Sequence, residues 1–428
     1  MNKSIPIVVA RPFSECLWPS FGWLVCTYFA TVLVLDRVVY ALVALIAVGI
    51  AFTALISYRP ILDRELRFFC LVLITNFFLA LPNIVLARDG LISLENPVRM
   101  LLMIPLIMGV MRYGLRPRFI CVGLAVGMLA AALVVGWQYH VLEMVRPGIH
   151  YNPILFSEVA MSAFGVLLAA CLTIRDRLVP LYLAGLLAAL YCVILSGTRG
   201  TLLAIVPMII FLLWWGWRFG AMGKFLLSRR RVLLFSIFLL LSGTVLFSAG
   251  HFVDRVELAI EQTIDYYEKG DASTPIGLRL EVWQAAWLAG NEHPVLGIGE
   301  INRQSYITHK ITSGELKSDI AIMRNTHNDY LYAFQSRGVP GLLLILLIYS
   351  LPMLIFIRGL TAVKDEQLFA SLGGVLLTIG YATYSLTSMP MYDGLPLVFY
   401  IVITSLCIGI VKHSQNAVSA DYSRKSCR

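Results

Sequence analysis

The stretch best suited to acid–base chemistry is RNTHNDYLYAFQSRGVPG, residues 324–341, where a histidine precedes a long apolar run. A neutral imidazole accepts a proton from a hydroxyl near pH 7, so His327 is the candidate general base. We expect Thr326 to cap the helix that starts here. Arg324 and the positive end of the helix dipole would both disfavour the imidazolium form. The competing interpretation is a histidine at the membrane boundary with satisfied hydrogen bonds and no reaction to perform.

Arg199 is a candidate for binding an anion. It lies in LSGTRGTLLA, between two apolar runs that are separated by almost no linker. We expect Thr198 to cap the following helix. Free backbone N–H groups at a helix start, beside an arginine, suit a phosphate group. The alternative is an arginine whose long side chain only reaches for water at the membrane edge.

A second cation recurs with two tryptophans. Arg279, Trp283 and Trp287 are spaced by four residues, so they share one face of a predicted helix. In the functional interpretation Arg279 binds a polyanionic substrate, and the tryptophans form a platform for an acceptor or a cap over the site. In the alternative, the arginine is solvated and the tryptophans rest on the membrane surface.

Several kinds of site are excluded by missing motifs. The chain has no HExxH, no CxxC pair and no GxxxxGK[ST], and its early loops hold no paired carboxylates for a metal. We therefore predict a reaction without a metal or another cofactor. The eight cysteines avoid the one long polar segment, so they do not form a disulfide framework. Few ionisable residues fall at mid-membrane depth, which argues against an ion-coupled transporter.

The elements that position these residues are predicted to be membrane helices. The chain has 428 residues, of which 59% are hydrophobic and 14% charged, whereas soluble domains carry about 25% charged residues. The sequence predicts an all-α polytopic membrane protein with about twelve transmembrane helices. The predicted spans are 15–35, 38–57, 67–87, 98–115, 118–138, 153–174, 178–196, 200–217, 232–250, 329–357, 367–386 and 393–411.

The distribution of basic residues predicts the orientation. Clusters such as Arg116–Arg118 and Arg229–Arg231 fall in loops on the same side as the termini, while the opposite short loops hold isolated arginines such as Arg37 and Arg88. The positive-inside rule then puts both termini in the cytoplasm. Because the net charge of +9 is spread over short membrane loops, it does not predict a nucleic-acid partner.

This topology divides the chain into four parts. Residues 1–250 hold the first nine transmembrane helices, 251–328 form an extracytoplasmic loop, 329–412 hold the last three helices, and 413–428 form a cytoplasmic tail. The loop has seven Lys and Arg against eleven Asp and Glu, so it is acidic. Helical periodicity places Val256, Ile260, Ile264 and Tyr267 on one face. We predict a mostly helical cap on the outer face.

Four stretches resemble the O-antigen ligase and polymerase superfamily of bacterial envelope glycosyltransferases. RPGIHYNPILFSEVA at 146–160 is similar to an Arg…Gly…Asn-Pro start of a membrane helix, and LSGTRGTLLA to a small-polar-Arg turn. GLRLEVWQAAWLAGNEHPVLGIGE at 277–300 resembles an Arg…Trp…His-Pro…Gly-x-Gly signature. THNDYLYAFQSRGVPG at 326–341 resembles a His-Asn-x-x-Leu…Gly-x-x-Gly signature. Arg337 is a departure, because the family often has an acidic or neutral residue there.

The resemblance implies a GT-C-like glycosyltransferase of the bacterial inner membrane, with its active site facing the periplasm. Such an enzyme moves a glycan from an undecaprenyl-pyrophosphate carrier to an acceptor hydroxyl among membrane lipids, without metal or nucleotide. Carried over by position, His327 would be the base, and Arg199 and Arg279 would hold the pyrophosphate. Arg324 and Arg146 are further candidates for that role. Leaving-group charge and acceptor activation are what such cations and such a base supply.

Three activities remain open within this interpretation. The single large loop near the C-terminal end favours a ligase, which joins O-antigen polysaccharide to the lipid A–core acceptor. A polymerase would instead join carrier-linked repeat units to one another. A transporter would bind the lipid-linked glycan at Arg199 and Arg279 without a reaction. The short basic tail makes a protein-glycosylating branch the less favoured alternative.

Overall fold

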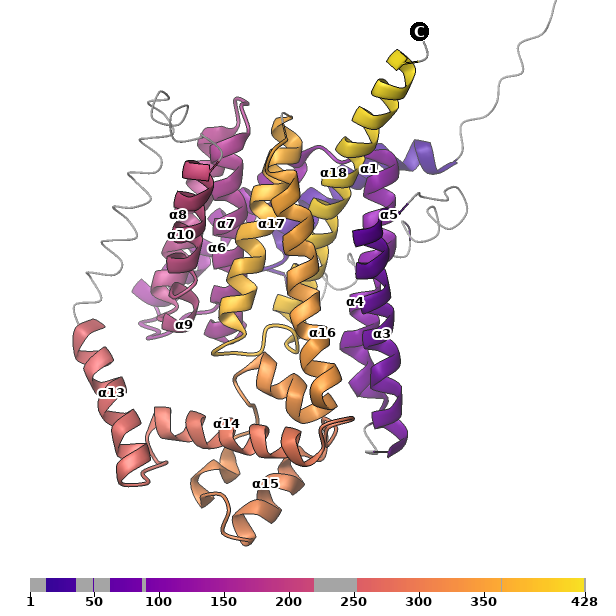
Figure 1. Ribbon diagram of the computed structural model, residues 1–428. Coiled ribbons are helices and arrows are strands. Elements are labelled where there is room, and N and C mark those ends of the chain that lie inside the picture. The colour runs from indigo at the N-terminus through magenta and orange to yellow at the C-terminus, as the bar shows by residue number, and fades with distance from the viewer. Residues whose placement is uncertain are drawn as a thin grey trace, which may run out of the picture.

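Most helices of the protein stand side by side, and a group of shorter helices gathers at one end of this bundle (Figure 1). A computed structural model describes residues 13–35, 49, 62–86, 90–218, 252–362 and 364–426. Every regular element in these ranges is helical, which confirms the predicted all-α class there. The predicted spans 38–57, apart from Gly49, and 232–250 lie outside the described residues, as do Arg37, Arg88 and Arg229–Arg231.

The described helices follow the predicted apolar runs closely. They are α1 (Phe13–Thr31), α3 (Arg64–Leu86), α4 (Glu95–Leu101), α5 (Met103–Tyr113), α6 (Pro117–His140), α7 (Pro153–Thr173), α8 (Val179–Leu195), α9 (Arg199–Leu202), α10 (Ile205–Arg218), α13 (Phe252–Glu268), α14 (Pro275–Glu292), α15 (Arg303–Thr312), α16 (Asp329–Gly359), α17 (Asp365–Tyr384) and α18 (Gly394–Ser426). Two 3-10 turns, η1 (Leu91–Leu94) and η2 (Ser318–Ile322), complete the set.

Six described helical stretches are long and apolar enough to cross a membrane. They are Arg64–Ile84, Pro117–His140, Pro153–Thr173, Arg199–Arg218, Asp329–Gly359 and Gly394–Ala417. The helix Val179–Leu195 is apolar but shorter. These helices support a membrane protein, and the count of twelve spans stays a prediction.

Two predicted spans are broken where proline interrupts them. The run 98–115 is divided at Leu102 between α4 and α5, and the run 200–217 is divided between α9 and α10. Proline lacks an N–H group, and its ring crowds the carbonyl four residues earlier. Pro105 and Pro207 therefore disfavour a continuous helix through 101 and 203. Hydropathy alone did not reveal either break.

The centre of the bundle is formed by α7 and α18. The most apolar windows of these helices are 89% and 94% buried within the protein, compared with 33% for α3. The helix α18 is one continuous element from Gly394 to Ser426. The predicted tail from 413 is therefore, as far as Ser426, an extension of the last helix rather than a separate segment.

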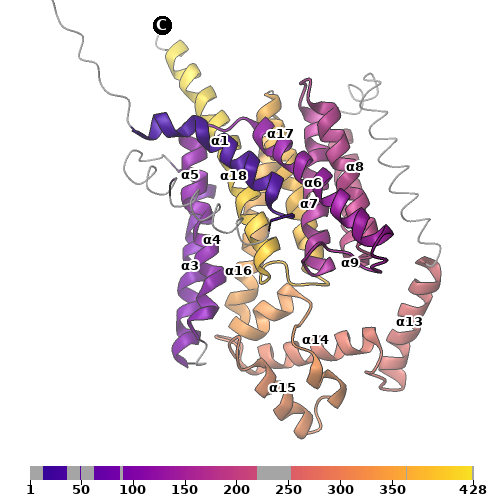
Figure 2. The same cartoon turned by 180° about the vertical axis from the view of Figure 1, so that it is seen from behind.

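The two ends of the bundle differ in character. At one end, Lys412 of α18 forms ion pairs with Asp63 and Glu65, and Arg358 of α16 pairs with Glu65. At the other end, α14 crosses beneath the bundle with α15 below it, opposite the C-terminal end of α18 (Figures 1 and 2). The ion-paired Lys412 and Arg358 and the helical cap thus lie at opposite ends of the described bundle, and the predicted membrane topology stays a prediction.

The cap is fastened to α16 through two glycines. Gly297 and Gly338 have φ of 67° and 64°, which side chains other than glycine rarely adopt. A Cβ on Gly338 would lie 2.3 Å from the carbonyl oxygen of Pro294. The backbones are paired here: Ile298 N donates to Gln335 O at 2.9 Å, and Val339 N donates to Pro294 O at 2.8 Å. The glycine-containing segments of the two signatures therefore form one joint.

Arg337 reinforces this joint from inside. Its side chain is 5% exposed, and Nη2 donates to Glu300 at 2.9 Å while Nη1 donates to the Asn76 side chain at 3.1 Å. Glu300 belongs to the cap and Asn76 to α3. The arginine that departs from the family pattern is therefore a buried tie between the cap, α3 and the kinked helix α16.

Candidate active site

His327 stands at the point where the cap chain enters α16. Its backbone is left-handed, with φ of 52°, a conformation that is uncommon outside glycine and is tolerated best by Asn, Asp and His. The N-cap of α16 is Asn328, whose side chain accepts a hydrogen bond from Leu331 N at 3.0 Å. The prediction that Thr326 is the N-cap residue is wrong. Its side-chain hydroxyl is fully buried and has no hydrogen-bond partner among the described residues.

The surroundings of His327 favour its neutral form. Partial burial lowers the pKa of the imidazole most, and the guanidinium groups of Arg279 and Arg303 lower it further. The sequence spacing had predicted that Arg324 would disfavour the imidazolium form, but the cations that lower this pKa are Arg279 and Arg303. A neutral ring at pH 7 is the form that accepts a proton, so the electrostatics suit a general base.

The helix α14 brings Arg279 and Trp283 to the histidine. Thr274 caps this helix by accepting from Gly277 N at 3.0 Å, and Glu292 ends it before His293 and Pro294, as predicted. Trp283 donates its Nε1–H to the carbonyl of Thr326 at 3.0 Å. Trp283 therefore holds the backbone directly before His327.

Trp287 occupies a different place from Trp283. Its ring packs against Phe334 of α16, with centroids 5.4 Å apart, and its side chain is 55% exposed. The two tryptophans share the α14 face as expected. Trp283 contacts the candidate catalytic segment through a hydrogen bond, and Trp287 contacts Phe334 within α16.

Arg199 and Arg146 lie beside one turn, residues 196–199, between α8 and α9. Arg146 Nε donates to Ser196 O at 3.4 Å, and Arg199 begins α9 three residues later, exposed. Thr198 stands at the N-cap position of α9, but the predicted capping hydrogen bond is not made. Its hydroxyl instead pairs with the Ser196 hydroxyl at 2.8 Å. Since α9 is a single turn, any anion binding here depends on the two guanidinium groups rather than on a helix dipole.

The loop between α17 and α18, residues 385–393, contacts both the segment that follows His327 and the turn that holds Arg199. Asp329 N donates to Ser385 O at 2.9 Å, and the buried Asp329 carboxylate accepts from Ser385 Oγ at 2.7 Å and from Met391 N at 3.1 Å. On the other side, a Cβ on Gly200 would lie 2.7 Å from Thr387 Oγ1. This loop joins the His327 segment to the Arg199 turn.

A cavity of about 780 Å³ lies beside the histidine segment. Arg303, Arg324, Tyr332, Tyr392 and Asp393 are among its lining residues. Burial raises the pKa of the Asp393 carboxyl to about 6. The sequence favoured Arg324 for the phosphate site by its spacing from His327 and left Arg303 open. The hydrogen bond from Arg303 to the carbonyl of Met323 brings α15 close to this segment.

The side chains near His327 differ in kind from a set of metal ligands. Among the residues that the structure describes, no three His, Cys, Asp or Glu side chains gather closely enough to hold a metal ion. The donors that do converge are an imidazole, guanidinium groups and tyrosine hydroxyls. Such a set suits proton transfer and the binding of an anionic oxygen group.

Comparison with known proteins gives two matches. Residues 184–346 match the model of the family described as O-Antigen ligase, and this range contains Arg199, Arg279 and His327. A Haemophilus influenzae protein described as uncharacterized is 23% identical over 376 residues, covering 85% of this chain and 92% of the relative. The match over residues 184–346 supports the resemblance to the O-antigen ligase superfamily that the sequence motifs suggested.

Proposed function

We propose that this protein is an O-antigen ligase, which transfers O-antigen polysaccharide from undecaprenyl pyrophosphate to the lipid A–core acceptor. The observation that carries the proposal is His327: a half-buried, left-handed histidine whose pKa is lowered by burial and by Arg279 and Arg303. It lies within the range that matches the O-antigen ligase family. Strained residues with perturbed pKa values concentrate at functional sites.

The proposed reaction is a displacement at the anomeric carbon of the donor. The neutral imidazole of His327 takes the proton from an acceptor hydroxyl as the oxygen forms a bond to that carbon. The bond from the carbon to the pyrophosphate oxygen breaks, and its electron pair leaves with undecaprenyl pyrophosphate. The base contributes about 10²- to 10⁴-fold to such a step. Pyrophosphate is already a good leaving group, so a metal is not required.

The arginines hold the leaving group in this proposal. Arg279 of α14 is near enough to His327 to lower the pKa of its ring, while Arg199 and Arg146 lie at the turn that contacts the loop 385–393. Guanidinium groups stay charged and bind phosphate oxygens in pairs, so they suit a pyrophosphate that gains charge as the bond breaks. Trp283 acts as a positioning residue through its hydrogen bond to Thr326.

The proposed setting is the periplasmic leaflet of the bacterial inner membrane, with both termini in the cytoplasm. The cap and the candidate site lie at one end of the bundle, and the C-terminal end of α18 lies at the other (Figure 2). The undecaprenyl tail would then lie along apolar helix faces below the cap.

The test replaces His327 by asparagine. Asparagine tolerates the left-handed backbone but is no base, so the variant separates loss of the base from backbone strain. We expect His327→Asn to accumulate normally in the membrane and to lose attachment of O-antigen to lipopolysaccharide by about 10²-fold or more. The matched control is His309→Asn, an exposed histidine of α15 in the same cap, which keeps normal laddering. Normal laddering in His327→Asn would remove the catalytic role.

A purified reaction identifies the product. We expect lipid-linked glycan and lipid A–core to yield glycosylated lipid A–core in the presence of EDTA. A product that stays on the carrier and grows longer would identify a polymerase instead. Binding of the donor without any product would identify a transporter. Loss of the reaction in EDTA, restored by a divalent metal, would contradict the metal-free mechanism.

A further inference from the structure

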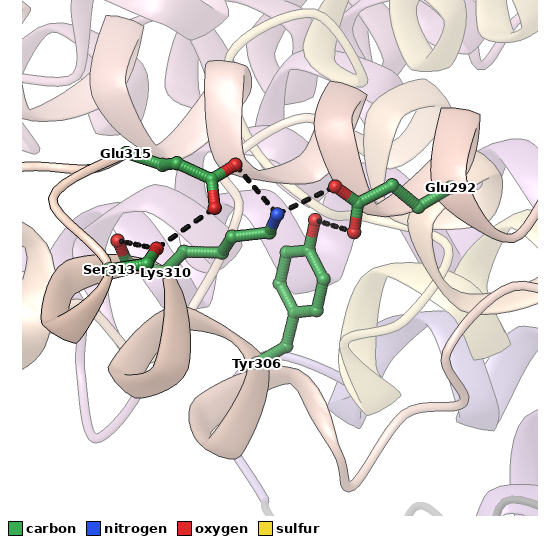
Figure 3. A network of polar contacts seen from close by, with 5 residues as sticks. All are labelled: Glu292, Tyr306, Lys310, Ser313 and Glu315. Carbon is green, nitrogen blue, oxygen red and sulfur yellow. Dashed lines mark hydrogen bonds and ion pairs between the residues drawn. The ribbon is translucent and has the colours of Figure 1, made fainter.

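The helix α15 carries two buried cations in opposite surroundings, and the contrast points to a ligand. Lys310 is 8% exposed and is fully engaged: its Nζ contacts Glu292 at 2.6 Å and Glu315 at 2.7 Å (Figure 3). Tyr306 and Ser313 donate to the same two carboxylates. This network neutralises the lysine inside the cap, so Lys310 has a structural part.

Arg303, two turns earlier on α15, lacks such neutralisation. It is 5% exposed, and only Nη1 has a partner, the carbonyl of Met323 at 2.8 Å. Its Nε and Nη2 are buried without a hydrogen-bond partner, and no carboxylate pairs with it in the part of the chain that the structure describes. A buried charge is normally paired, because otherwise the free energy lost when the charge is removed from water is not offset by interactions in the protein.

The unpaired guanidinium borders a space large enough for a sugar. Arg303 lines the cavity of about 780 Å³ together with Arg324, Tyr332, Tyr392 and Asp393. The rings of Tyr332 and Tyr392 meet edge to face, with centroids 4.2 Å apart. Two acidic residues also line the cavity, Asp393 and Glu300, and the second is paired with Arg337. Aromatic rings, carboxyl groups and arginines together offer apolar faces, acceptors and donors to a polyhydroxylated ligand.

The cavity is also lined by the chain segment that leads to the proposed base. Arg324 and Asn325, which line it, precede His327 by three and two residues. Arg303 is close enough to His327 to lower the pKa of its ring. A ligand group that reached Arg303 would therefore lie in the neighbourhood of the imidazole.

We infer that Arg303 binds an anionic oxygen group, a phosphate or a carboxylate, carried by a substrate glycan in this cavity. A guanidinium with free Nε and Nη2 presents the parallel pair of N–H donors that such groups accept. The anion comes either from the pyrophosphate of the donor or from an acidic substituent on the acceptor sugar. The identity of the glycan rests on the proposed function, whereas the anion site itself does not.

A binding measurement tests the site without requiring the reaction. Full-length protein in lipid nanodiscs is titrated with inorganic pyrophosphate, and separately with glucuronic acid, while its thermal unfolding is followed. We expect wild-type protein to be stabilised by at least one probe and Arg303→Gln to bind that probe at least tenfold more weakly. Arg303→Lys keeps the charge and is expected to show intermediate affinity, which covers the case in which the glutamine variant does not fold.

Lys310→Gln is the matched control, since it removes the other buried cation of α15. We expect this variant to unfold at a lower temperature and to bind the probe as tightly as wild type. Equal probe affinity in wild type and both Arg303 variants, or failure of wild type to bind either probe, overturns the inference.

Steady-state kinetics separate the two sources of the anion. A rise in KM for the lipid-linked donor in Arg303→Lys assigns the anion to the pyrophosphate, and a rise in KM for the acceptor assigns it to the acceptor sugar. The two proposals fail differently. If probe binding depends on Arg303 while His327→Asn still transfers glycan, the proposed mechanism is wrong and the anion site stands. If transfer depends on His327 while neither probe binds, the proposed mechanism stands and the anion site at Arg303 is wrong.

Discussion

At the scale of single residues, His327 combines two costs that a merely structural histidine would avoid. Its backbone adopts the left-handed region, and its ring lies in partial burial between cations. The left-handed backbone would be relieved by glycine at this position. The lowered pKa would be relieved by removing a neighbouring cation such as Arg279. The protein keeps both, which is the pattern expected where strain and a shifted pKa serve a reaction.

The lowered pKa of His327 predicts the acidic side of the pH–rate profile. Only the neutral ring accepts a proton, so transfer is lost as pH falls through the pKa, which lies below the ordinary value of 6.5. Replacing Arg279 by glutamine removes one of the causes that lower this pKa. We expect Arg279→Gln to move the acidic limb of the profile to higher pH, in addition to slowing the reaction.

The position of the limb is read from initial rates between about pH 5 and 8, the range in which a histidine titrates. Arg324→Gln serves as the comparison, because Arg324 is not among the groups that depress the ring. We expect its limb to stay with that of wild type. An Arg279→Gln limb at the wild-type position, or at lower pH, contradicts the electrostatic assignment.

At the scale of elements, the cap is held by its joint with α16. The segments around Gly297 and Gly338 exchange backbone hydrogen bonds, and Arg337 ties the joint to Glu300 and to α3. This joint lies within the helix that His327 directly precedes. The geometry of the base therefore depends on how firmly α14 and α16 are fastened together.

Replacing Gly338 by alanine tests this joint. At Gly338 φ is 64° and ψ is −158°, a backbone region that is essentially restricted to glycine and costs another residue about 1–3 kcal/mol. The new Cβ would also lie 2.3 Å from the Pro294 carbonyl oxygen. Overpacking adds about 1–3 kcal/mol. We expect Gly338→Ala to lower the unfolding temperature clearly and to reduce transfer, as measured by thermal unfolding in detergent and by laddering.

Gly314→Ala is the matched control for backbone strain. Gly314 also has a positive φ, 79°, but no atom lies within 4 Å of the position that a Cβ would take. We expect this variant to lose only the conformational part, about 1 kcal/mol. Equal destabilisation by the two substitutions would show that the contact with Pro294 adds nothing to stability.

Local signals in the sequence predicted the elements well and their ends less well. The apolar runs gave the helices, and His293-Pro294 gave the end of α14. The caps at Thr198 and Thr326 were wrong because a nearer partner was available: Ser196 engages the first, and Asn328 takes the place of the second. Competition between neighbouring polar side chains is decided by packing, which spacing does not reveal.

Contacts between distant segments could not be predicted. Arg303 neighbours His327 because η2 and residues 323–327 fold back onto α15, and Asp329 binds a loop more than fifty residues later. Neither contact has a periodic or local signature in the chain. In contrast, Arg279 and Trp283 reach the same segment from one predicted helix face, so their joint placement followed from helical spacing.

At the scale of the whole molecule, the separation of the two ends is the property that the proposed function needs. The cap helices lie at one end, and the pairs of Lys412 and Arg358 lie at the other. A transferase acting outside the cytoplasm requires these ends to face opposite sides of the membrane. The predicted twelve-span topology, which stays untested, would make that assignment.

Cysteine labelling in intact cells tests the topology. In a cysteine-free background, we expect Lys269→Cys in the cap to react with a membrane-impermeant maleimide from outside the inner membrane. Glu366→Cys, an exposed position at the start of α17, should react only after the membrane is opened. Labelling of both positions in intact spheroplasts, or of Glu366→Cys alone, contradicts the predicted orientation.

The loop 385–393 has a consequence for the kinetics of two substrates. Its Ser385 hydroxyl and Met391 N–H donate hydrogen bonds to the Asp329 carboxyl group, two residues after His327, and its Thr387 hydroxyl lies next to Gly200 beside Arg199. A ligand that displaced this loop on one side would also displace the groups that it contacts on the other. Any resulting coupling is reciprocal: the factor by which bound acceptor changes the affinity for the donor equals the factor by which bound donor changes the affinity for the acceptor. In the proposed transferase, this loop is therefore the element through which each substrate would affect the binding of the other.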